Sequence, residues 1–316
     1  MDNKIKIIFL GSPEFAIPSL QNLIKDPRFK ILAVITQPDK PVGRKMTLTP
    51  PPVKKFALEN NIPVWQPEKV KEVAEKISDL NPDFLVVVAY GKLVPKSVLT
   101  LPKYGCVNVH GSILPLYRGS AVLQAPILNG DNESGVTIML MDEGLDTGPI
   151  LKIAKVNLEK NETGAILQDK LSILGAKTLP DILINFSQGK IIPEPQARET
   201  LYCPEIKKAD GKIDWNKPAI EIERQARAYY PWPGTFSISN YQSSIINKTL
   251  KIISVENKIF PINKYKPGEV FLDNNKLAVQ CGQDALIITK LQLEGGKPLS
   301  AEEFLRGHKD FIGTIL

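Results

Sequence analysis

Apolar residues in the first half of the chain form short continuous runs, separated by stretches with helical spacing. The runs at 4–10, 31–36 and 84–89 are almost wholly apolar, which is typical of strands buried on both faces of a parallel sheet. Between the first two runs, apolar residues recur every three or four positions through 15–24, which predicts a helix. Strand, helix and strand in this order indicate an α/β fold with a mostly parallel sheet.

The same alternation continues to about residue 186. It predicts helices near 53–60, 68–79 and 163–186, and strands near 106–109, 136–141 and 150–156. The segment 37–52 is rich in Pro and Lys and is predicted to be a loop. Ser12, followed by Pro13 and Glu14, is predicted to be the N-cap of the first helix.

The pattern changes after residue 189. Residues 190–208 hold three prolines and no apolar period, which predicts a linker crossing the surface of the first domain. Residues 212–232 contain one short helical pattern. The short strand-like runs beyond it lie at 235–239, 250–255, 268–272, 277–281 and 285–293. Short strands separated by turn residues favour a small β-barrel or sandwich, so the expected domains are 1–189 and 209–316.

Composition narrows the class of protein. Of 316 residues, 43% are hydrophobic and 23% charged, as in ordinary globular proteins. No apolar run approaches the roughly 18 residues of a membrane span, and the N-terminus has no signal-peptide anatomy, so we expect a cytoplasmic protein that does not bind membranes. The net charge of +6 is not concentrated in one segment, so composition permits a nucleic-acid partner without requiring one.

The cysteines and the first turn exclude two kinds of site. Cys106, Cys203 and Cys281 are scattered and form no C-x-x-C pair, which argues against a disulfide framework and against a metal site. The sheet pattern is Rossmann-like, but the turn after the first strand reads Gly-Ser-Pro-Glu-Phe-Ala at 11–16. It lacks G-x-G-x-x-G, so a dinucleotide site is not predicted.

Candidate chemistry is densest around Asn108 and His110. Alternation along a strand places both side chains on one face, and Gly111 follows at the strand end. Ligands of open parallel sheets bind outside the carboxyl ends of strands, so both side chains are expected to face a cleft. On their own, an asparagine satisfied by backbone groups and a core histidine are the commoner roles. His110 is one of only two histidines in the chain.

A second polar cluster, Met-Asp-Glu-Gly-Leu-Asp-Thr-Gly at 141–148, follows another predicted strand. From it, Asp146 can reach His110 and hold the imidazole in one state; an Asx turn is its alternative role. Asparagine, histidine and aspartate together suit acyl transfer to an amine, because two donors can stabilise an oxyanion and a carboxylate can assist proton removal. Ser112 has no G-x-S-x-G elbow and nothing would activate Cys106, so direct transfer is expected.

These residues carry a family resemblance. The stretch Asn-Val-His-Gly-Ser-Ile-Leu-Pro at 108–115, followed by Tyr-Arg-Gly at 117–119, resembles the signature of the folate-dependent formyltransferases. The resemblance implies that Asn108, His110 and Asp146 are catalytic and that 10-formyltetrahydrofolate is the donor. It implies folate contacts from Ser112, Ile113, Leu114 and Pro115. The pteridine is expected between the 90–94 region and the loop at 142–146.

Further segments are similar to those family members whose acceptor is the methionyl group on an initiator tRNA. These segments lie at 9–15, 36–54, 231–233 and 291–300. The resemblance implies a monomeric enzyme of translation initiation with an OB-like C-terminal domain that helps to hold the tRNA. It also implies tRNA contacts from Arg44 and Lys45, with phosphate contacts open to Lys40, Lys54 and Lys55. The run Arg-Lys-Met-Thr at 44–47 is less basic than is usual in the family.

Three other functions are compatible with the same residues. An enzyme of the same chemistry can use an amino-sugar nucleotide or a purine precursor as acceptor. A hydrolase that releases formate from formyl-folate would share Asn108, His110 and Asp146 and admit water. An RNA-binding protein without activity would retain the fold alone, and the intact set of three polar residues argues against it.

Overall fold

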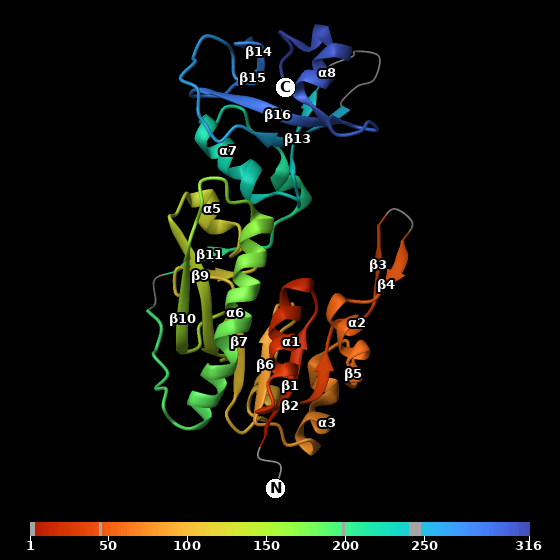
Figure 1. The fold of residues 1–316 in the computed structure, drawn as a ribbon, viewed down its shortest axis with the longest axis vertical. Helices are drawn as coiled ribbons and strands as arrows, with labels where there is room; N and C mark the ends of the chain where they lie inside the picture. The colour runs from red at the N-terminus through yellow and green to blue at the C-terminus, as the bar shows by residue number, and fades with distance from the viewer. Residues whose placement is uncertain (1–3, 44–45, 198–199, 240–247) are drawn as a thin grey trace. The chain divides into compact units, whose positions relative to one another are not determined.

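The computed structural model describes residues 4–43, 46–197, 200–239 and 248–316. The chain forms two compact units, coloured along the sequence in Figure 1. The first unit comprises Met1–Val122, Glu133–Val156 and Gln168–Cys203. The second unit comprises Leu123–Asn132, Asn157–Leu167 and Pro204–Leu316. Two segments of the second unit therefore interrupt the first unit along the sequence.

The first unit is built on a seven-stranded sheet. In spatial order its strands are β10 (Ile150–Asn157), β9 (Glu133–Leu140), β7 (Cys106–His110), β6 (Phe84–Val88), β1 (Ile5–Gly11), β2 (Phe29–Ile35) and β5 (Val64–Trp65). The pairs from β5 through β2, β1 and β6 to β7 are parallel, and β7 pairs with β9 in the antiparallel sense. The prediction of an α/β fold dominated by parallel strands is confirmed.

Helices cover both faces of this sheet. On one face, alternate residues of β1, Ile8 and Leu10, share a core with the helices η2 (Val70–Val73), α3 (Ala74–Asp79) and α4 (Lys96–Leu99). The opposite face carries α1 (Ile17–Lys25) and the long α6 (Gly164–Ser187). A Cβ atom at Gly175 of α6 would lie 2.7 Å from a methyl carbon of Val109, so glycine permits this close packing. Helix α2 (Pro52–Glu59) contacts β5.

Ser12, directly after β1, has a different role from the one predicted. The first helical turn is the 3-10 helix η1 (Glu14–Ala16), and neither it nor α1 has a side-chain N-cap. The Ser12 hydroxyl instead lies 3.2 Å from both the Gln37 N–H and the Thr36 hydroxyl, and it donates to the Tyr90 carbonyl at 3.5 Å. The predicted N-cap is therefore wrong, because the carboxyl ends of β1, β2 and β6 recruit this hydroxyl.

Several short elements escape the sequence pattern. The predicted loop 37–52 contains a hairpin of β3 (Lys40–Val42) and β4 (Thr47–Thr49). Strand β8 (Tyr117–Gly119) pairs in parallel with β11 (Leu201–Cys203), which lies within the predicted linker. The five-residue helix α5 (Ala125–Asn129) also has no counterpart in the prediction. Runs of three to five residues are too short to show a period of either kind.

The second unit is dominated by a separate, antiparallel sheet. Its strands pair in the order β12 (Thr235–Ser239), β13 (Lys248–Val255), β16 (Ala285–Leu293), β15 (Lys276–Gln280) and β14 (Val270–Asp273), and β17 (Leu299–Ser300) pairs with β16. Helices α7 (Ala219–Ala228) and α8 (Ala301–Gly307) contribute Ile222 and Phe304 to its core, as does Phe311 of η4 (Lys309–Phe311). The 3-10 helix η3 (Lys208–Gly211) precedes α7. The prediction of a separate, β-rich C-terminal domain is confirmed.

Within the second unit, α5 packs against α7. The Arg224 guanidinium donates to the Asn129 carbonyl at 3.1 Å and lies where a Cβ atom of Gly130 would be. Gly130 also has a φ of +73° at the end of α5, so glycine is required there for both reasons. Across the described residues, no helix is long and apolar enough to cross a membrane.

Candidate active site

Strand β7 places Asn108 and His110 at the carboxyl end of the parallel strands. Asn108 lies opposite Val87 of β6 and Met139 of β9, and its side chain is half-buried. His110 is only 5% exposed. The two residues share the face of the strand opposite to that of Val109, which packs against α6. Both side chains therefore lie on the same side of the sheet as the core of α3 and α4.

The imidazole of His110 is held between two oxygen atoms. Its Nε2 lies 2.8 Å from the Tyr117 carbonyl oxygen. A carbonyl oxygen only accepts hydrogen bonds, so Nε2 carries a proton and donates. Its Nδ1 faces Asp146 Oδ1 at 3.6 Å, a distance longer than a hydrogen bond. Nδ1 is therefore the ring nitrogen left for a substrate, and it accepts when the ring is neutral and donates when the ring is protonated.

The structure brings Asp146 to His110 on a strained loop. Asp146 has a φ of +53°, in the left-handed region that few residues other than glycine occupy. Its Oδ2 accepts from the Gly119 N–H at 2.9 Å, which leaves Oδ1 directed at the imidazole. The neighbouring Asp142 accepts from the Gly144 N–H at 3.0 Å and from the Thr147 hydroxyl at 2.7 Å. Asp142 therefore forms the turn, and Asp146 does not.

The segment 112–115 directly follows His110 and Gly111 and is held by hydrogen bonds. The Ser112 side chain is fully buried and donates to the same Tyr117 carbonyl at 2.8 Å. Leu114 is also buried, and its N–H donates to the Thr137 hydroxyl at 3.0 Å. Ile113 and Pro115 are half-buried. Ile113 and Pro115 are therefore the more exposed of the four predicted folate contacts, while the bonds of Ser112 and Leu114 fix the shape of the segment.

The thiol on this strand is not activated. Burial raises the pKa of Cys106 to about 12, and its Sγ donates to the Leu99 carbonyl at 3.7 Å. A nucleophilic thiol needs a low pKa, so the arrangement favours direct transfer. No group of three or more His, Cys, Asp or Glu residues that could hold a metal ion occurs in the part of the chain that the structure describes.

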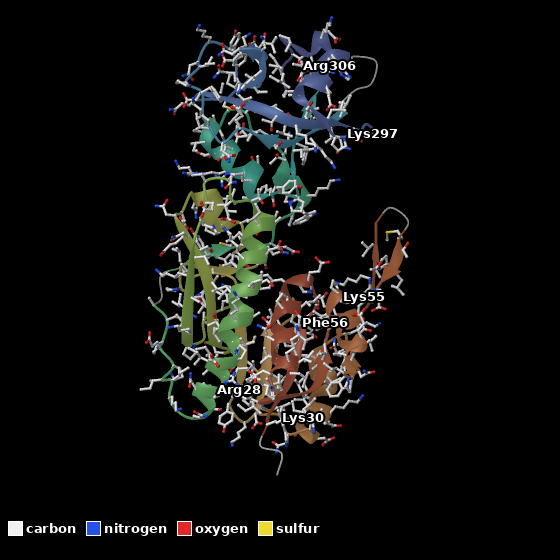
Figure 2. The ribbon with its side chains drawn as sticks, viewed as in Figure 1. Arg28, Lys30, Lys55, Phe56, Lys297 and Arg306 are labelled. Carbon is white, nitrogen blue, oxygen red and sulfur yellow. The ribbon has the colours of Figure 1, made fainter. Side chains whose placement is uncertain are left out.

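The predicted tRNA contacts are only partly visible. Arg44 and Lys45 lie outside the described residues. The Lys40 ammonium donates to the Gln37 side chain at 2.7 Å, and that of Lys54 lies 2.9 Å from both oxygens of Asp39. Lys55, by contrast, is exposed on α2 (Figure 2). Lys54 therefore has a structural partner, whereas Lys55 is open to a phosphate.

Arg118 and Gln196 support the loop that carries Asp146, a role that the sequence does not predict for either residue. The Gln196 side-chain NH₂ donates to the carbonyls of Asp146 at 2.9 Å and Gly148 at 2.6 Å. Arg118 in turn donates to the Gln196 side-chain oxygen. Arg118 lies inside the recognised 117–119 motif, which is a signal for it. Nothing in the sequence connects Gln196 to a loop 50 residues earlier.

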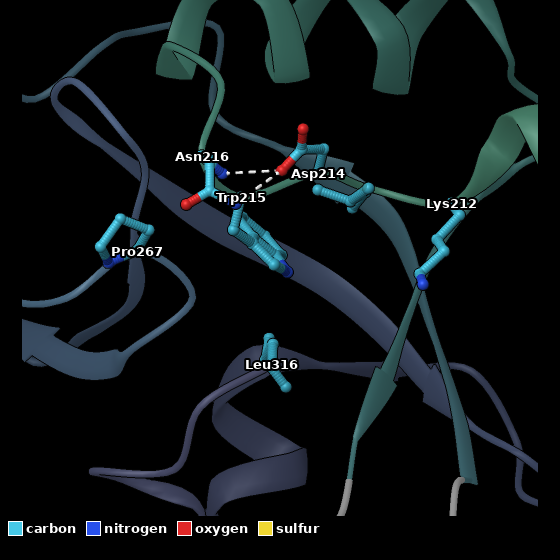
Figure 3. Close-up of a pocket in the computed structure, with 7 residues that line it drawn as sticks. Lys212, Asp214, Trp215, Asn216, Pro267 and Leu316 are labelled. Carbon is cyan, nitrogen blue, oxygen red and sulfur yellow. Dashed lines mark hydrogen bonds between the residues drawn. The ribbon is translucent and has the colours of Figure 1, made fainter.

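A cavity of about 340 Å³ lies within the second unit (Figure 3). Its lining consists of Lys212, Ile213, Asp214, Trp215, Asn216, Pro267 and Leu316. Hydrogen bonds from Asn216 lower the pKa of Asp214, and the Trp215 indole donates to Ser237 at 3.1 Å. These polar groups already have partners in the chain, and none of the lining residues belongs to the cluster at β7. The cavity therefore does not include any of the predicted catalytic residues.

Comparison with known proteins fits this geometry. Residues 4–183 match the Formyl transferase family, and residues 205–309 match the Formyl transferase C-terminal domain. The chain belongs to the formyl transferase family. The recognised family is thereby confirmed, and the cluster of Asn108, His110 and Asp146 lies in the part of the chain that the first match covers.

Relatives of this formyl transferase match along nearly their whole length. Methionyl-tRNA formyltransferase of Caldicellulosiruptor saccharolyticus is 45% identical, with 98% of this chain and 99% of the relative covered. The enzyme of the same name from Caldanaerobacter subterraneus is 43% identical, with 99% and 100% covered. The N-formyltransferase of Helicobacter canadensis, solved with folinic acid and dTDP-3-aminofucose, superposes with a TM-score of 0.66 at 21% identity. That comparison covers 90% of this chain and 98% of the other.

Proposed function

We propose that this chain transfers the formyl group of 10-formyltetrahydrofolate to the α-amino group of methionyl initiator tRNA, for translation initiation. The observation that carries the proposal is that this member of the formyl transferase family places Asn108, His110 and Asp146 together at the carboxyl end of β7. The relatives named methionyl-tRNA formyltransferase match along the full chain and favour this acceptor over an amino sugar.

The three polar side chains have distinct roles in the proposed reaction. The methionyl amine attacks the formyl carbon and gives a tetrahedral intermediate with an oxyanion. The Asn108 side-chain NH₂ and Nδ1 of a protonated His110 donate to that oxyanion, an effect worth roughly 3 kcal/mol for each donor. The Tyr117 carbonyl keeps the ring orientation fixed through Nε2. No covalent intermediate on the enzyme is needed.

The proton that the amine loses passes by way of Asp146 to the leaving nitrogen of the folate, so the reaction balances. Asp146 Oδ1 accepts the proton that the attacking amine loses, while Oδ2 stays bound to the Gly119 N–H. When the new C–N bond has formed, the bond from carbon to the folate N10 breaks and the electron pair stays on N10. The proton is then delivered to N10, and the products are formyl-methionyl-tRNA and tetrahydrofolate. A carboxylate beside an imidazole suits both proton transfers.

The topology supports a folate site beside β7. The chain order reverses between β1 and β6, since β2 and β5 lie on one side of β1 while β6 and β7 lie on the other. Ligands of such sheets bind at this point, outside the carboxyl ends of the strands. The segment 90–94 follows β6 there, and Ile113 and Pro115 remain partly exposed. We infer that the pteridine lies between 90–94 and the loop at 142–146, with Ser112 and Leu114 shaping the segment from below.

The remaining parts of the proposal concern the acceptor. We infer a Rossmann-like catalytic domain over 1–189, a linker over 190–208 and an OB-like, tRNA-binding domain over 209–316. The exposed Lys55 and the segment that contains Arg44 and Lys45 would contact phosphates. In the second unit, the Trp232 side chain is 57% exposed and offers a surface for stacking. We expect the enzyme to act as a cytoplasmic monomer.

The test is a formyl-transfer assay with 10-formyltetrahydrofolate and methionyl-tRNA as substrates. Parallel reactions contain an amino-sugar nucleotide or no acceptor. Formyl-methionyl-tRNA as the main product supports the proposal. Folate turnover that is faster with the sugar nucleotide, or that proceeds equally without any acceptor, would replace the acceptor by a sugar or by water while keeping Asn108, His110 and Asp146 in their roles.

A further inference from the structure

The side-chain amide of Gln196 binds two backbone carbonyls of the loop that carries Asp146. Both hydrogens of the Gln196 NH₂ are used, one for the Asp146 carbonyl at 2.9 Å and one for the Gly148 carbonyl at 2.6 Å. The Gln196 side-chain oxygen accepts from two nitrogens of Arg118, at 3.2 and 2.7 Å. Arg118 is buried and also donates to the Ala197 carbonyl at 3.1 Å. Every hydrogen-bonding group of this amide therefore has a partner.

The bonds from Gln196 act where the loop is conformationally costly. Asp146 has a φ of +53°, a conformation that a non-glycine residue keeps only when its surroundings enforce it. The two carbonyls that Gln196 binds belong to Asp146 itself and to Gly148, two residues later. The Gly119 N–H fixes the carboxylate, while Gln196 fixes the backbone. Together these contacts determine where Oδ1 lies relative to His110.

We propose that Gln196, oriented by Arg118, is a positioning residue that holds the Asp146 carboxylate against His110 for formyl transfer. The inference rests on the proposed function of the site. Gln196 does not touch the reacting atoms, and it acts through the loop at 146–148. The segment at 190–197 is therefore part of the catalytic framework as well as a connection between sequence regions.

The chemistry of the amide suggests a discriminating substitution. Gln196→Glu keeps the shape of the side chain and strengthens the contact with the Arg118 guanidinium. It also removes both hydrogens that the Asp146 and Gly148 carbonyls accept, and it places a negative oxygen against them. If Gln196 served only to attach the 190–197 segment to Arg118, Gln196→Glu would be neutral. If it positions Asp146, the variant is defective while it stays folded.

The experiment compares Gln196→Glu with wild type and with Gln188→Glu, the same substitution at an exposed residue beyond α6. We expect kcat to fall ~10- to 100-fold in Gln196→Glu, as for small misplacements of a catalytic group. KM for both substrates and the thermal midpoint should stay near wild type, and Gln188→Glu should be unchanged. In an Asp146→Asn background, Gln196→Glu should add less than ~2-fold, because effects of residues that act as a unit are not additive.

A second readout does not depend on the acceptor. The chain has two histidines, His110 and His308, so histidine-labelled protein gives two sets of ring signals by NMR. Gln196→Glu should shift the His110 ring signals and leave those of His308 in place. Wild type that fails to formylate methionyl-tRNA would overturn the proposed function, and this shift would still decide the role of Gln196. Unchanged kcat, or an unchanged His110 signal, would overturn the inference.

Discussion

The Tyr117 carbonyl sets the orientation of the His110 imidazole and the position of one of its protons. This single oxygen accepts from both the imidazole Nε2 and the Ser112 hydroxyl, at 2.8 Å each. It assigns a proton to Nε2 and turns Nδ1 toward Asp146. The buried Ser112 hydroxyl therefore helps to fix the carbonyl that orients His110. The contact that ties His110 to the Tyr117 carbonyl is thus compatible with the catalytic role proposed for this histidine.

Asn108 gives the first prediction at this scale. Asn108→Ala should lower kcat by ~100-fold or more, as the loss of one oxyanion donor does in acyl transfer. Its effect on KM for tRNA should be small, since the bond forms only in the transition state. Single-turnover formylation with saturating folate measures the chemical step directly. A loss smaller than ~2-fold, with the thermal midpoint unchanged, would remove Asn108 from the mechanism.

The residue types of the site are predictable from sequence, and their supports are not. Asn108 and His110 stand two apart on a strand, and a period of two is enough to place them on one face. Asp146 is marked by its glycine-rich loop. Ser12 shows the limit, because a hydroxyl before Pro and Glu has the pattern of an N-cap yet binds across three strand ends. Such bonds connect residues far apart in the sequence, and local patterns carry no information about them.

At the scale of elements, the proline inside α6 is compensated by a neighbouring helix. Pro180 has no N–H, so the carbonyl of Ala176, four residues earlier, loses its partner in the helix. The side-chain NH₂ of Asn22 on α1 donates to that carbonyl at 2.9 Å. The long helix therefore continues through the proline, and the bond joins α1 to α6 on one face of the sheet.

This pair gives a double-mutant prediction. Asn22→Ala should lower the free energy of unfolding by ~1 kcal/mol, because it leaves a carbonyl without a donor. In a Pro180→Ala background the restored N–H can bind Ala176, so Asn22→Ala should cost clearly less there. Urea unfolding followed by circular dichroism measures both values. Asn60→Ala is the matched control, since that amide caps Phe56 on α2 and should show no coupling. Equal losses from Asn22→Ala in both backgrounds would contradict the account.

The long elements of the fold follow from the sequence because their period is sustained. The strands β1, β2 and β6 and the helix α6 lie where continuous apolar runs and helical spacing place them. Strand β11 fails this test, since its three residues lie among prolines and charges and pair only with the equally short β8. Pairing of such strands depends on tertiary contacts, which outweigh local preference.

The base of the β3–β4 hairpin gives the third prediction. Lys54 is bound to Asp39, which also accepts from Gln66 at 2.7 Å, and these bonds lower the pKa of Asp39. Lys55 is exposed on the same helix. Lys55→Ala should therefore reduce the slope of log affinity for tRNA against log salt concentration by ~1, through one lost phosphate contact. Lys54→Ala should leave the slope unchanged.

Filter binding of methionyl-tRNA over a series of salt concentrations measures these slopes. Lys30→Ala serves as the control, because Lys30 is an exposed lysine on β2 of the same unit, away from Lys55 (Figure 2). It should behave as wild type. A reduced slope in Lys54→Ala together with an unchanged slope in Lys55→Ala would show that the ion pair with Asp39 opens on tRNA and that the exposed lysine is a bystander.

On the scale of the whole molecule, each of the two units has a hydrophobic core that contains a buried thiol. Cys106 lies in the core between the first sheet and α3, and Cys281 lies in the core of the second sheet. Burial raises the pKa of both thiols from the ordinary value of 9.0 to about 12. Both are apolar packing groups at neutral pH, so the redox chemistry of either would require unfolding of its unit.

The raised pKa values of these two thiols predict that the free energy of unfolding falls as pH rises above about 9. A group whose folded pKa is raised binds its proton more tightly in the folded state, so it stabilises that state below the unfolded pKa. The stabilisation is then lost as pH rises from about 9 toward 12. Between pH 8 and 10, each thiol should lower the free energy of unfolding of its unit by about 1 kcal/mol. Urea unfolding at pH 8 and at pH 10, followed by a spectroscopic signal specific to each unit, measures the difference in the free energy of unfolding.

The control separates the thiols from the many lysines that also titrate. Cys106→Ala should be less stable than wild type at pH 8, by ~1 kcal/mol for the lost buried sulfur, and should lose less stability than wild type on going to pH 10. Cys281→Ala should do the same for the second unit. The formylation rate of Cys106→Ala at pH 7.5 should stay within ~2-fold of wild type. A steeper loss of stability with pH in the variants than in wild type would reverse the sign, and would mean that these thiols are already ionised in the folded protein.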